Sequence, residues 1–330
     1  MQLLRSYWWI LLIMAVVIVM AIVLIPSDYR KIEPDPQTGK GIEWNMPDIN
    51  RLPSTPQGDL IRYGKELIAH TAVYFGPKGK VASISNGMNC ENCHLDAGTR
   101  FLGNNYSAVY ATYPKFRARS GSIETIYKRV NDCFERSLNG KAIDSSSLEM
   151  KAIYAYIQWL GENVPKGTKP TGAGIADIPL LGRPSDPDIG KHIYTQKCQR
   201  CHSENGEGLL NTAGNDYKYP PLWGEHSYNN GAGLFRISRL AGYIRYNMPF
   251  TPLDNDNDTD DAPLTDEQAW DVAAYINSQP RPQKKYDGDW PDISTKPFDH
   301  PFGPYADNFT EAQHKYGPFG EIKKLGKKKS

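Results

Sequence analysis

One pattern, C-x-x-C-H, occurs twice in this chain, as Cys90-Glu-Asn-Cys93-His94 and as Cys198-Gln-Arg-Cys201-His202. The two copies use four of the five cysteines. The spacing suits covalent attachment of c-type haem, because the two thiols add to the two vinyl groups of one porphyrin and the adjacent imidazole binds the iron as proximal ligand. The sequence therefore predicts two covalently attached haem c groups.

Each motif predicts one attachment site and one iron ligand. The predicted residues are Cys90, Cys93 and His94 for haem 1, and Cys198, Cys201 and His202 for haem 2. A zinc ribbon would combine both cysteine pairs into one site, but it does not require a histidine after each second cysteine. A thioredoxin-like site needs a single pair beside a βαβ pattern, which the sequence does not show. Two tandem motifs favour haem over both alternatives.

The composition narrows the class of protein. The chain has 330 residues, and its 38 basic and 37 acidic side chains leave a net charge of +1, so we expect no general attraction to nucleic acid. The length allows one or two sizeable cores. Its 29 glycines, 25 prolines and 20 tyrosines indicate much irregular backbone between short helices, as in a chain that folds around a cofactor.

The N-terminus carries an unbroken apolar run at residues 8–25, long enough to cross a bilayer, with Arg5 before it. Residues 1–30 are therefore predicted to be a membrane anchor or a signal peptide. The anchor is favoured, because no small-x-small cleavage pattern follows the run before Pro26. Haem of this type is attached outside the bacterial cytoplasm, so we expect a periplasmic protein anchored to the inner membrane, or released if the segment is cleaved.

Both motifs lie in copies of one helical unit. Short amphipathic helices are predicted before the motifs at 59–66 and 188–194. Closing helices follow the motifs, and they begin at the capping-box patterns Ser146-Ser-Leu-Glu149 and Thr265-Asp-Glu-Gln268. A first helix that crosses a last helix, with haem attached between them, resembles the class I cytochrome c fold. The predicted fold class is all-α, with two such domains in tandem.

We divide the chain into five segments. The anchor or signal covers 1–30, the haem 1 domain 31–165 and the haem 2 domain 188–280. Residues 166–187 are rich in Pro and Gly and form the predicted linker. Residues 281–330 contain too many aromatic rings for a freely solvated tail, so we predict an irregular extension that wraps over the two domains.

The sixth iron position separates an electron carrier from a catalyst. For haem 2 the predicted ligand is Met248, because the following Pro249 disfavours helix and places the thioether on an extended loop between the motif and the closing helix. A core methionine is the alternative interpretation. His226 is the alternative ligand.

For haem 1 the remaining cysteine, Cys133, is the candidate. It lies in segment 122–140, which predicts a helix capped by Ser122 and stopped at Asn139-Gly140. An unpaired cysteine on an apolar helical face is usually a small buried hydrophobic residue. A free thiol in an exported protein is, however, a liability unless it is used. We therefore favour ligation or catalysis by Cys133 over a packing role.

Polar side chains accompany Cys133 along its helix. Arg129 lies one turn before it and Ser137 one turn after it, so a guanidinium, a thiolate and a hydroxyl share one stripe. Arg119 stands just upstream. A single arginine is usually a surface charge. Together, beside a sulfur that ligates haem, these residues indicate an anion-binding site.

The chain resembles the thiosulfate dehydrogenase family over nearly all of its length after the anchor. The resemblance is carried by the two haem motifs, by the segment Asn-Asp-Cys133-Phe-Glu-Arg-Ser137 and by Asn247-Met248-Pro249. These dihaem proteins couple two thiosulfates into tetrathionate or run the reverse reaction. The resemblance implies a thiosulfate or tetrathionate substrate and a periplasmic or membrane cytochrome as redox partner. The family roles carried over are ligation of the active-site haem by Cys133, a substrate site lined by Arg119, Arg129 and Ser137, and ligation of the electron-transfer haem by Met248.

One position departs from part of this family. Some members place a lysine just before the ligating methionine as a ligand that exchanges with the redox state, and this chain has Asn247 there. We therefore predict no ligand exchange at haem 2.

Two other functions compete with the enzyme. A non-catalytic dihaem electron carrier would need Cys133 only for packing, and a peroxidase would need an iron that can open, for which the sequence offers no partner in peroxide cleavage. The acidic run 254–261 with Glu267 matches the carboxylate spacing of an EF-hand, but Asp261 occupies the position where that loop requires glycine. We interpret the run as a solvated loop.

Overall fold

The computed structural model describes residues 41–250 and 263–328. The predicted anchor or signal at 1–30 and the acidic run at 254–261 lie outside the described residues. Within the described ranges, no helix is both long enough and apolar enough to cross a membrane.

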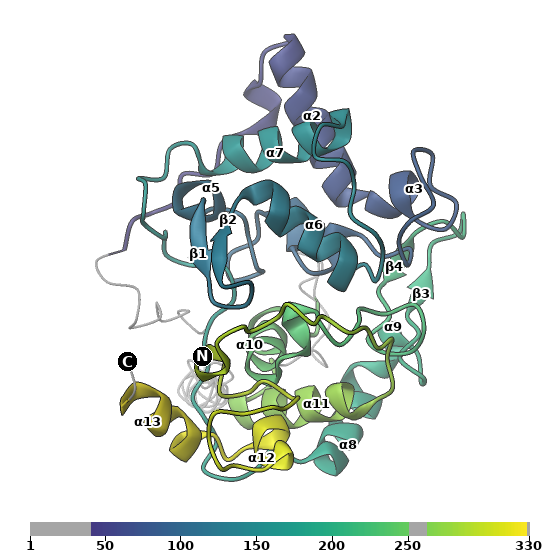
Figure 1. Ribbon diagram of the computed structural model, residues 1–330. Coiled ribbons are helices and arrows are strands. Elements are labelled where there is room, and N and C mark those ends of the chain that lie inside the picture. Colours follow the sequence, from purple (N-terminus) through teal and green to yellow (C-terminus); the bar gives the residue numbers. More distant parts are fainter. Residues whose placement is uncertain (1–40, 251–262, 329–330) are drawn as a thin grey trace, which may run out of the picture. The chain divides into compact units, whose positions relative to one another are not determined.

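Figure 1 shows short helices joined by long irregular segments. The first haem region contains η2 (Ile49–Arg51), α2 (Pro56–Ala69), α3 (Thr71–Phe75), η3 (Cys90–Asn92), α4 (Leu95–Gly98), α5 (Val109–Thr112), β1 (Lys115–Arg117), β2 (Ser122–Glu124), α6 (Ile126–Arg136) and α7 (Leu148–Gly161). The second contains α8 (Pro187–Lys197), α9 (Gln199–His202), β3 (Leu209–Leu210), β4 (Tyr217–Tyr219), η4 (Gly233–Phe235), α10 (Ile237–Asn247) and α11 (Asp266–Ser278). The C-terminal extension contains η5 (Ile293–Thr295), α12 (Glu311–Tyr316) and α13 (Gly320–Lys328).

In both regions the first helix packs across the closing helix, α2 on α7 and α8 on α11 (Figure 1). A glycine makes each crossing possible. A Cβ on Gly64 would lie 2.0 Å from the carbonyl oxygen of Ala152, and a Cβ on Gly190 would lie 2.0 Å from that of Asp271. Any larger residue would push these backbones apart. The repeated crossing confirms two cytochrome c domains in tandem.

The helix caps explain where these elements begin. Thr265 and Gln268 form the predicted capping box of α11. At α7 the cap is Ser147, whose hydroxyl accepts a hydrogen bond from the backbone of Met150 (3.1 Å). The predicted cap, Ser146, donates instead to Asp144 (2.7 Å), so the start of this helix was predicted one residue too early.

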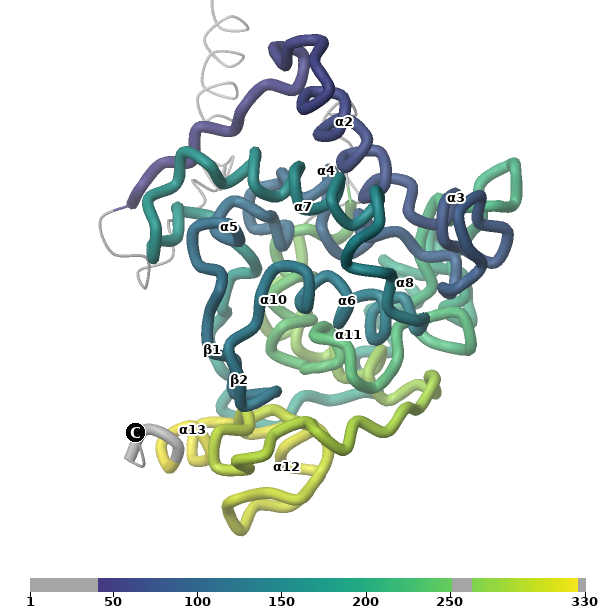
Figure 2. The backbone as a smooth tube through the Cα atoms, turned by 45° about the horizontal axis from the view of Figure 1, so that its top comes forward, coloured from purple at the N-terminus to yellow at the C-terminus, as the bar shows by residue number. Residues whose placement is uncertain are grey.

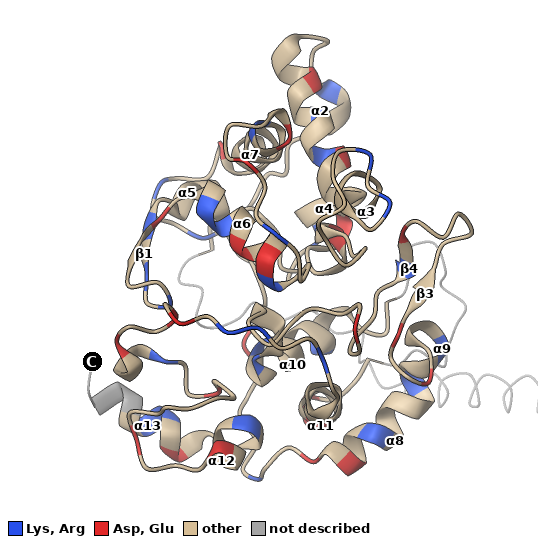
Figure 3. Cartoon of the chain, turned by 45° about the vertical axis from the view of Figure 1, so that its right-hand side comes forward, with Lys and Arg blue, Asp and Glu red and all other residues tan. Residues whose placement is uncertain are grey.

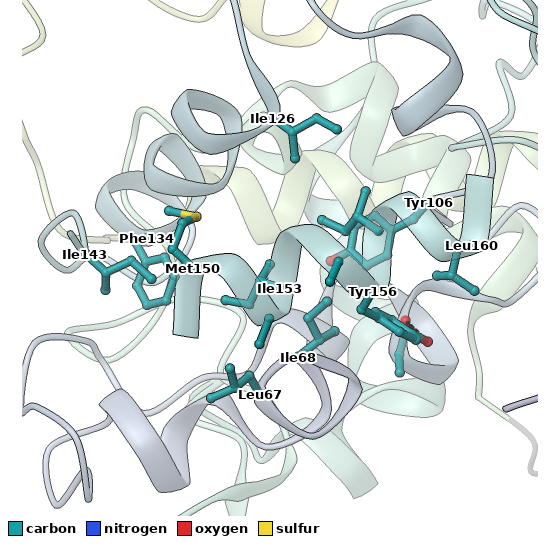
Figure 4. Packing of buried hydrophobic residues seen from close by; sticks show 14 of the residues in the cluster. Leu67, Ile68, Tyr106, Ile126, Phe134, Ile143, Met150, Ile153, Tyr156 and Leu160 are labelled. Atoms are coloured by element: carbon teal, nitrogen blue, oxygen red, sulfur yellow. Dashed lines mark hydrogen bonds between the residues drawn. The ribbon is translucent and has the colours of Figure 1, made fainter. Parts of the chain in front are cut away.

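The apolar core of the first region lies between α2, α6 and α7. Figure 4 shows Leu67 and Ile68 of α2 packed against Met150 and Ile153 of α7, with Phe134 of α6 beside them. Phe134 and Leu67 are fully buried. This core holds α6 firmly, so the opposite face of that helix can carry polar groups.

The predicted helix at 122–140 was wrong in its first turn. Ser122–Glu124 is β2, which pairs antiparallel with β1. The helix begins only at Ile126, where the hydroxyl of Thr125 accepts a hydrogen bond from the backbone of Lys128 (3.3 Å). Strand pairing satisfies backbone groups that an earlier helix start would have used. This hairpin and a second one, β3 with β4, are small exceptions to the predicted all-α fold.

The C-terminal extension is less irregular than predicted, because it contains α12 and α13. Its residues contact both haem regions. Trp290 donates its backbone N–H to the carbonyl oxygen of Arg119 (2.6 Å), and Asp299 accepts hydrogen bonds from Arg236 and Ser238. Figure 2 shows the yellow-green extension running beside the β1–β2 hairpin.

One ion pair joins this extension to the end of α6. Asp289 accepts two hydrogen bonds from Arg136 (2.7 and 2.8 Å), and the Arg136 guanidinium lies 3.8 Å from the centroid of the Tyr286 ring. The Arg136 side chain is only 8% exposed. We expect Asp289→Asn to lower the free energy of unfolding by about 2 kcal/mol, because the buried guanidinium loses its bidentate carboxylate partner and keeps only Asp132, whose Oδ1 lies 3.9 Å from the Arg136 Nε.

Denaturant titration of the haem-loaded protein measures this effect. Asp287→Asn, two residues away at an exposed position, is the matched control and should change stability by less than about 0.5 kcal/mol. Equal stabilities of the two variants would contradict the bracing role of Asp289.

Candidate functional site

A cavity in the first region brings the first haem motif together with α6. About 1190 Å³ of space, partly open to solvent, is left unfilled by protein atoms. The lining includes Cys90, Cys93, His94, Arg129, Cys133 and Ser137, together with the aliphatic residues Ile68, Val109, Ile126, Val130, Ile153 and Ile157. The structure therefore places the attachment peptide and apolar side chains around one space, as a covalently held porphyrin requires.

His94 is held in the orientation of an iron ligand. Its Nδ1–H donates to the carbonyl oxygen of Asn104 (2.5 Å), and Tyr106 stacks on the ring with centroids 4.5 Å apart. Burial lowers the pKa of His94 to about 4, so the ring is neutral. With Nδ1 protonated, the Nε2 lone pair is available to a metal.

Helix α6 presents the predicted polar stripe to the cavity. Arg129, Cys133 and Ser137 all line it, whereas Phe134 points into the core. The negative charge of a Cys133 thiolate is the main cause that raises the pKa of Arg129, so the guanidinium stays charged beside the sulfur. Burial, and after it the charge of Cys133, raises the pKa of Cys93 to about 12, which places Cys133 close to the attachment cysteines.

Arg119 lies elsewhere. It is not among the residues that line this cavity in the described part of the chain. Its Nη1 donates to the carbonyl oxygen of Gly231 (3.3 Å), and its guanidinium lies 5.8 Å from the ring centroid of Trp290. Burial, followed by the charges of Arg136 and Arg129, lowers the pKa of Arg119 to about 10. Of the four predicted catalytic residues, the structure gathers three at the cavity.

The lining also contains basic residues that the sequence analysis missed. Lys115 and Arg117 come from β1, and Lys169 from the segment between the haem regions. The run Tyr113-Pro-Lys-Phe-Arg117 was visible in the sequence, but only the strand places both basic side chains on one face.

A second cavity, with about 1320 Å³ unfilled by protein atoms and also partly open to solvent, surrounds the second motif. Cys198, Cys201, His202 and Met248 line it. The Nδ1–H of His202 donates to the carbonyl oxygen of Pro220 (2.8 Å), as His94 does in the first cavity. Met248 has the extended backbone that was predicted, at the end of α10.

The alternative ligand does not reach this space. His226 is exposed and is absent from the described residues that line the second cavity. Asn247, beside Met248, is buried and donates its side-chain amide to the carbonyl oxygens of Leu102 (3.2 Å) and Tyr243 (3.0 Å). Its side chain is therefore used for packing between the regions.

The two cavities share a wall. Cys93 lines both, and Asn92 of the first motif also lines the second cavity. The hydroxyl of Tyr243 on α10 donates to the carbonyl oxygen of Asn92 (3.0 Å), which ties the two regions together there. Groups held in the two cavities are thus separated by little more than one attachment peptide.

Both cavities fit haem c by the chemistry of their residues. Each offers two thiols, an imidazole fixed by a backbone carbonyl and a mainly apolar interior, which are what attachment, ligation and exclusion of water require. The SoxA/TsdA cytochrome c domain family matches residues 80–165, and the cytochrome c family matches residues 187–280. The fold and the two sites define a dihaem c-type cytochrome, with two covalently attached haem c groups.

Relatives identify the family. The chain is 36% identical over 247 residues to a thiosulfate dehydrogenase of Psychrobacter arcticus, covering 74% of this chain and 71% of that protein. It is 35% identical to the thiosulfate dehydrogenase of Allochromatium vinosum, covering 72% of this chain and 84% of the other. This chain belongs to the thiosulfate dehydrogenase family.

A solved structure agrees with this assignment. The structure of thiosulfate dehydrogenase (TsdBA) from Marichromatium purpuratum superimposes with a TM-score of 0.67 at 33% identity, over 74% of this chain. This chain spans about half the length of that one, since the match covers 51% of it.

Proposed function

We propose that this protein is a thiosulfate dehydrogenase that interconverts two thiosulfates and tetrathionate, with two electrons passing to a cytochrome partner. The observation that carries the proposal is that Cys133 and Arg129 line the same cavity as the attachment peptide of haem 1. A carrier of electrons needs no thiol and no buried cation there. The names of the relatives support the same substrate.

Cys133 would hold the iron of haem 1 together with His94, and its sulfur is the proposed reacting nucleophile. When bound, the two haems supply the acceptors that take up two electrons one at a time. The thiolate of Cys133 forms a bond to the outer sulfur of one thiosulfate, and this bond formation releases the two electrons. The product is a Cys133 thiosulfonate with a single negative charge.

The second thiosulfate completes the reaction. Its outer sulfur attacks the outer sulfur of the thiosulfonate, the bond to Cys133 breaks, and tetrathionate leaves. The electron pair of the broken bond returns to the Cys133 sulfur, which becomes a thiolate again. No proton is needed in either step, and the reverse sequence reduces tetrathionate.

The polar stripe offsets repulsion between the substrates. Two dianions about 4 Å apart repel by about 4 kcal/mol even at the dielectric of water. Arg129 can donate two parallel hydrogen bonds to one thiosulfate, and the Ser137 hydroxyl can donate another. Arg119 does not line the cavity in the described part of the chain, but it is close enough to Arg129 for their charges to interact, so it adds positive potential near the site.

Met248 is the proposed sixth ligand of haem 2, without ligand exchange because Asn247 replaces the lysine of some relatives. We expect Met248→Leu to retain the haem but to lose the ferric absorption band of the methionine–iron bond. The reduction potential of haem 2 should fall, because thioether ligation raises it within the span of about 0.8 V that axial ligands control.

Spectra and potentiometric titration of the haem-loaded protein test this prediction. The adjacent Asn247→Ala variant is the control and should keep the band. A Met248→Leu variant with the wild-type band would exclude Met248 as ligand.

The anchor, the compartment and the partner belong to the proposal as well. We assign residues 1–30 to an inner-membrane anchor, or to a signal if the segment is cleaved, and the haem domains to the periplasm. A periplasmic or membrane cytochrome would accept the electrons. Fractionation of cells that express the full chain tests the location.

A two-way assay of the haem-loaded protein tests the activity itself. We expect thiosulfate plus an artificial oxidant to give tetrathionate, and tetrathionate plus an artificial reductant to give thiosulfate. No turnover in either direction, together with two ferric spectra of the His/Met type, would establish a dihaem electron carrier instead. A ferric low-spin spectrum of the His/thiolate type at one haem would support the enzyme.

A further inference from the structure

We propose that Lys115, Arg117 and Lys169 bind the two propionate groups of haem 1. These residues line the first cavity but belong to neither the haem motif nor the stripe on α6. The inference rests on haem attachment at the first motif and does not depend on the reaction proposed above.

Covalent attachment decides which end of the cavity the propionates occupy. The vinyl groups and the propionate groups of haem lie on opposite edges of the porphyrin. Thioether bonds at Cys90 and Cys93 therefore turn both propionates away from the attachment peptide. The carboxylates must reach the part of the cavity lining that lies farthest from these cysteines, and there they need cations or water.

The three basic residues lie near one another within the lining. Lys115 is influenced by the charges of Arg117, Lys169, Arg129 and Glu124, whereas Cys133 is the cavity residue whose charge acts on Cys90 and Cys93. The charge of Arg129 acts on Lys115 and also on His94, so this arginine lies near both the basic group and the haem motif. Figure 3 shows basic positions gathered along β1.

The strand geometry turns both basic residues of β1 inward. Side chains alternate along a strand, and Phe116, between Lys115 and Arg117, is 62% exposed on the opposite face. The Lys115 Nζ lies 4.7 Å from the ring centroid of Tyr113, a residue that also lines the cavity. Lys169 reaches the same space from the irregular segment that precedes α8.

The charges of this group leave room for two carboxylates. Glu124 is the nearby acidic residue, 3% exposed, with Oε2 3.9 Å from Nε of Arg117 and without a hydrogen-bond partner. One carboxylate among three cations leaves two positive charges. Two propionates would balance them. Burial is the first cause that lowers the pKa of Lys115 to about 8, followed by the positive charges of Arg117 and Lys169.

This assignment divides the cations of the cavity between two tasks. The cations of β1 and the linker neutralise the propionates, so these carboxylates do not repel a dianionic substrate. Arg129, beside Cys133, is left for the substrate. A haem that kept its propionates unpaired would add two negative charges next to the site that has to admit thiosulfate.

The test uses the haem-loaded protein and the double variant Lys115→Gln/Arg117→Gln. We expect the reduction potential of haem 1 to fall, because uncompensated propionates stabilise ferric iron, while that of haem 2 stays unchanged as an internal reference. Redox-difference infrared spectra should show shifted propionate bands, identified by ¹³C labelling of the haem carboxyl groups. Lys151→Gln, an exposed lysine of α7 outside the cavity lining, should alter neither quantity.

A double variant that conserves both charges distinguishes an electrostatic effect from a merely structural one. Lys115→Arg/Arg117→Lys should keep the haem 1 potential close to that of the wild type. The proposal is overturned if this pair shifts the potential as much as the glutamine pair does. It is also overturned if the glutamine pair leaves the potential and the propionate bands unchanged but raises KM for thiosulfate, which would make the group a substrate site. Loss of activity in a Cys133→Gly variant tests the proposed reaction, and it affects neither the reduction potential nor the infrared result expected here.

Discussion

Replacing Cys133 by glycine should leave both haems attached and lower kcat for tetrathionate formation by at least about 10³-fold, as expected when a nucleophile is removed. Attachment depends on the four motif cysteines, none of which is changed. Cys133 lines the first cavity together with Cys90 and Cys93 and is the proposed iron ligand and reacting sulfur. Pyridine haemochrome analysis gives the haem content, and the two-way assay gives kcat in each direction.

Cys133→Met is the informative control. It keeps a sulfur that can bind iron but cannot form a thiosulfonate, so we expect a six-coordinate haem 1 and an equally large loss of kcat. If the glycine variant retained wild-type turnover, the covalent mechanism would be excluded and Cys133 would be left with ligation or packing.

Replacing Arg129 by leucine should lower kcat/KM for thiosulfate by about 100-fold, because a buried charge-assisted hydrogen bond contributes about 3 kcal/mol. The guanidinium lies one helical turn from Cys133 and faces the same cavity. Its loss removes the counter-charge of both the substrate and the thiolate. Steady-state kinetics over a range of thiosulfate concentrations separates KM from kcat.

Two further variants show whether the loss of kcat/KM is specific to the Arg129 guanidinium. Arg129→Lys keeps the charge but cannot donate two parallel hydrogen bonds, so its kcat/KM should fall between those of the leucine variant and the wild type. Lys128→Gln removes the exposed positive charge that pairs with the buried Asp132, and it should leave kcat/KM within a factor of about two, because Lys128 is not among the described residues that line the cavity. Equal effects of Arg129→Leu and Lys128→Gln would indicate general electrostatics instead of a substrate contact.

Local sequence was sufficient for the haem motifs and for the first and closing helices of the two domains, α2, α7, α8 and α11. C-x-x-C-H is a chemical requirement of attachment within five residues, so no tertiary information is needed to find it. The capping box at Thr265 and Gln268 is equally local. The glycines at the helix crossings, Gly64 and Gly190, each lie in the first helix of a domain, but at unequal distances from the following motif, so no local pattern marks them as crossing points.

Tertiary structure was needed wherever distant segments compete for the same backbone groups or the same space. Ser122 could cap a helix in isolation, but β1 pairs with residues 122–124 and leaves the cap to Thr125. Arg119 is close to the stripe in sequence, yet Gly231 and Trp290 hold its side chain outside the cavity. Strand pairing and long-range packing act between residues far apart in the chain, and no local pattern records them.

Chain order alone therefore specifies two haem c groups, their proximal histidines and the helices that enclose them, because these depend on residues within a few turns of each other. The arrangement of charge around haem 1 depends on the fold. Lys115 and Arg117 meet Lys169 at one cavity only because a strand and a linker segment converge there. Electrostatic energy depends on distance in space, and a sequence lists neighbours only along the chain.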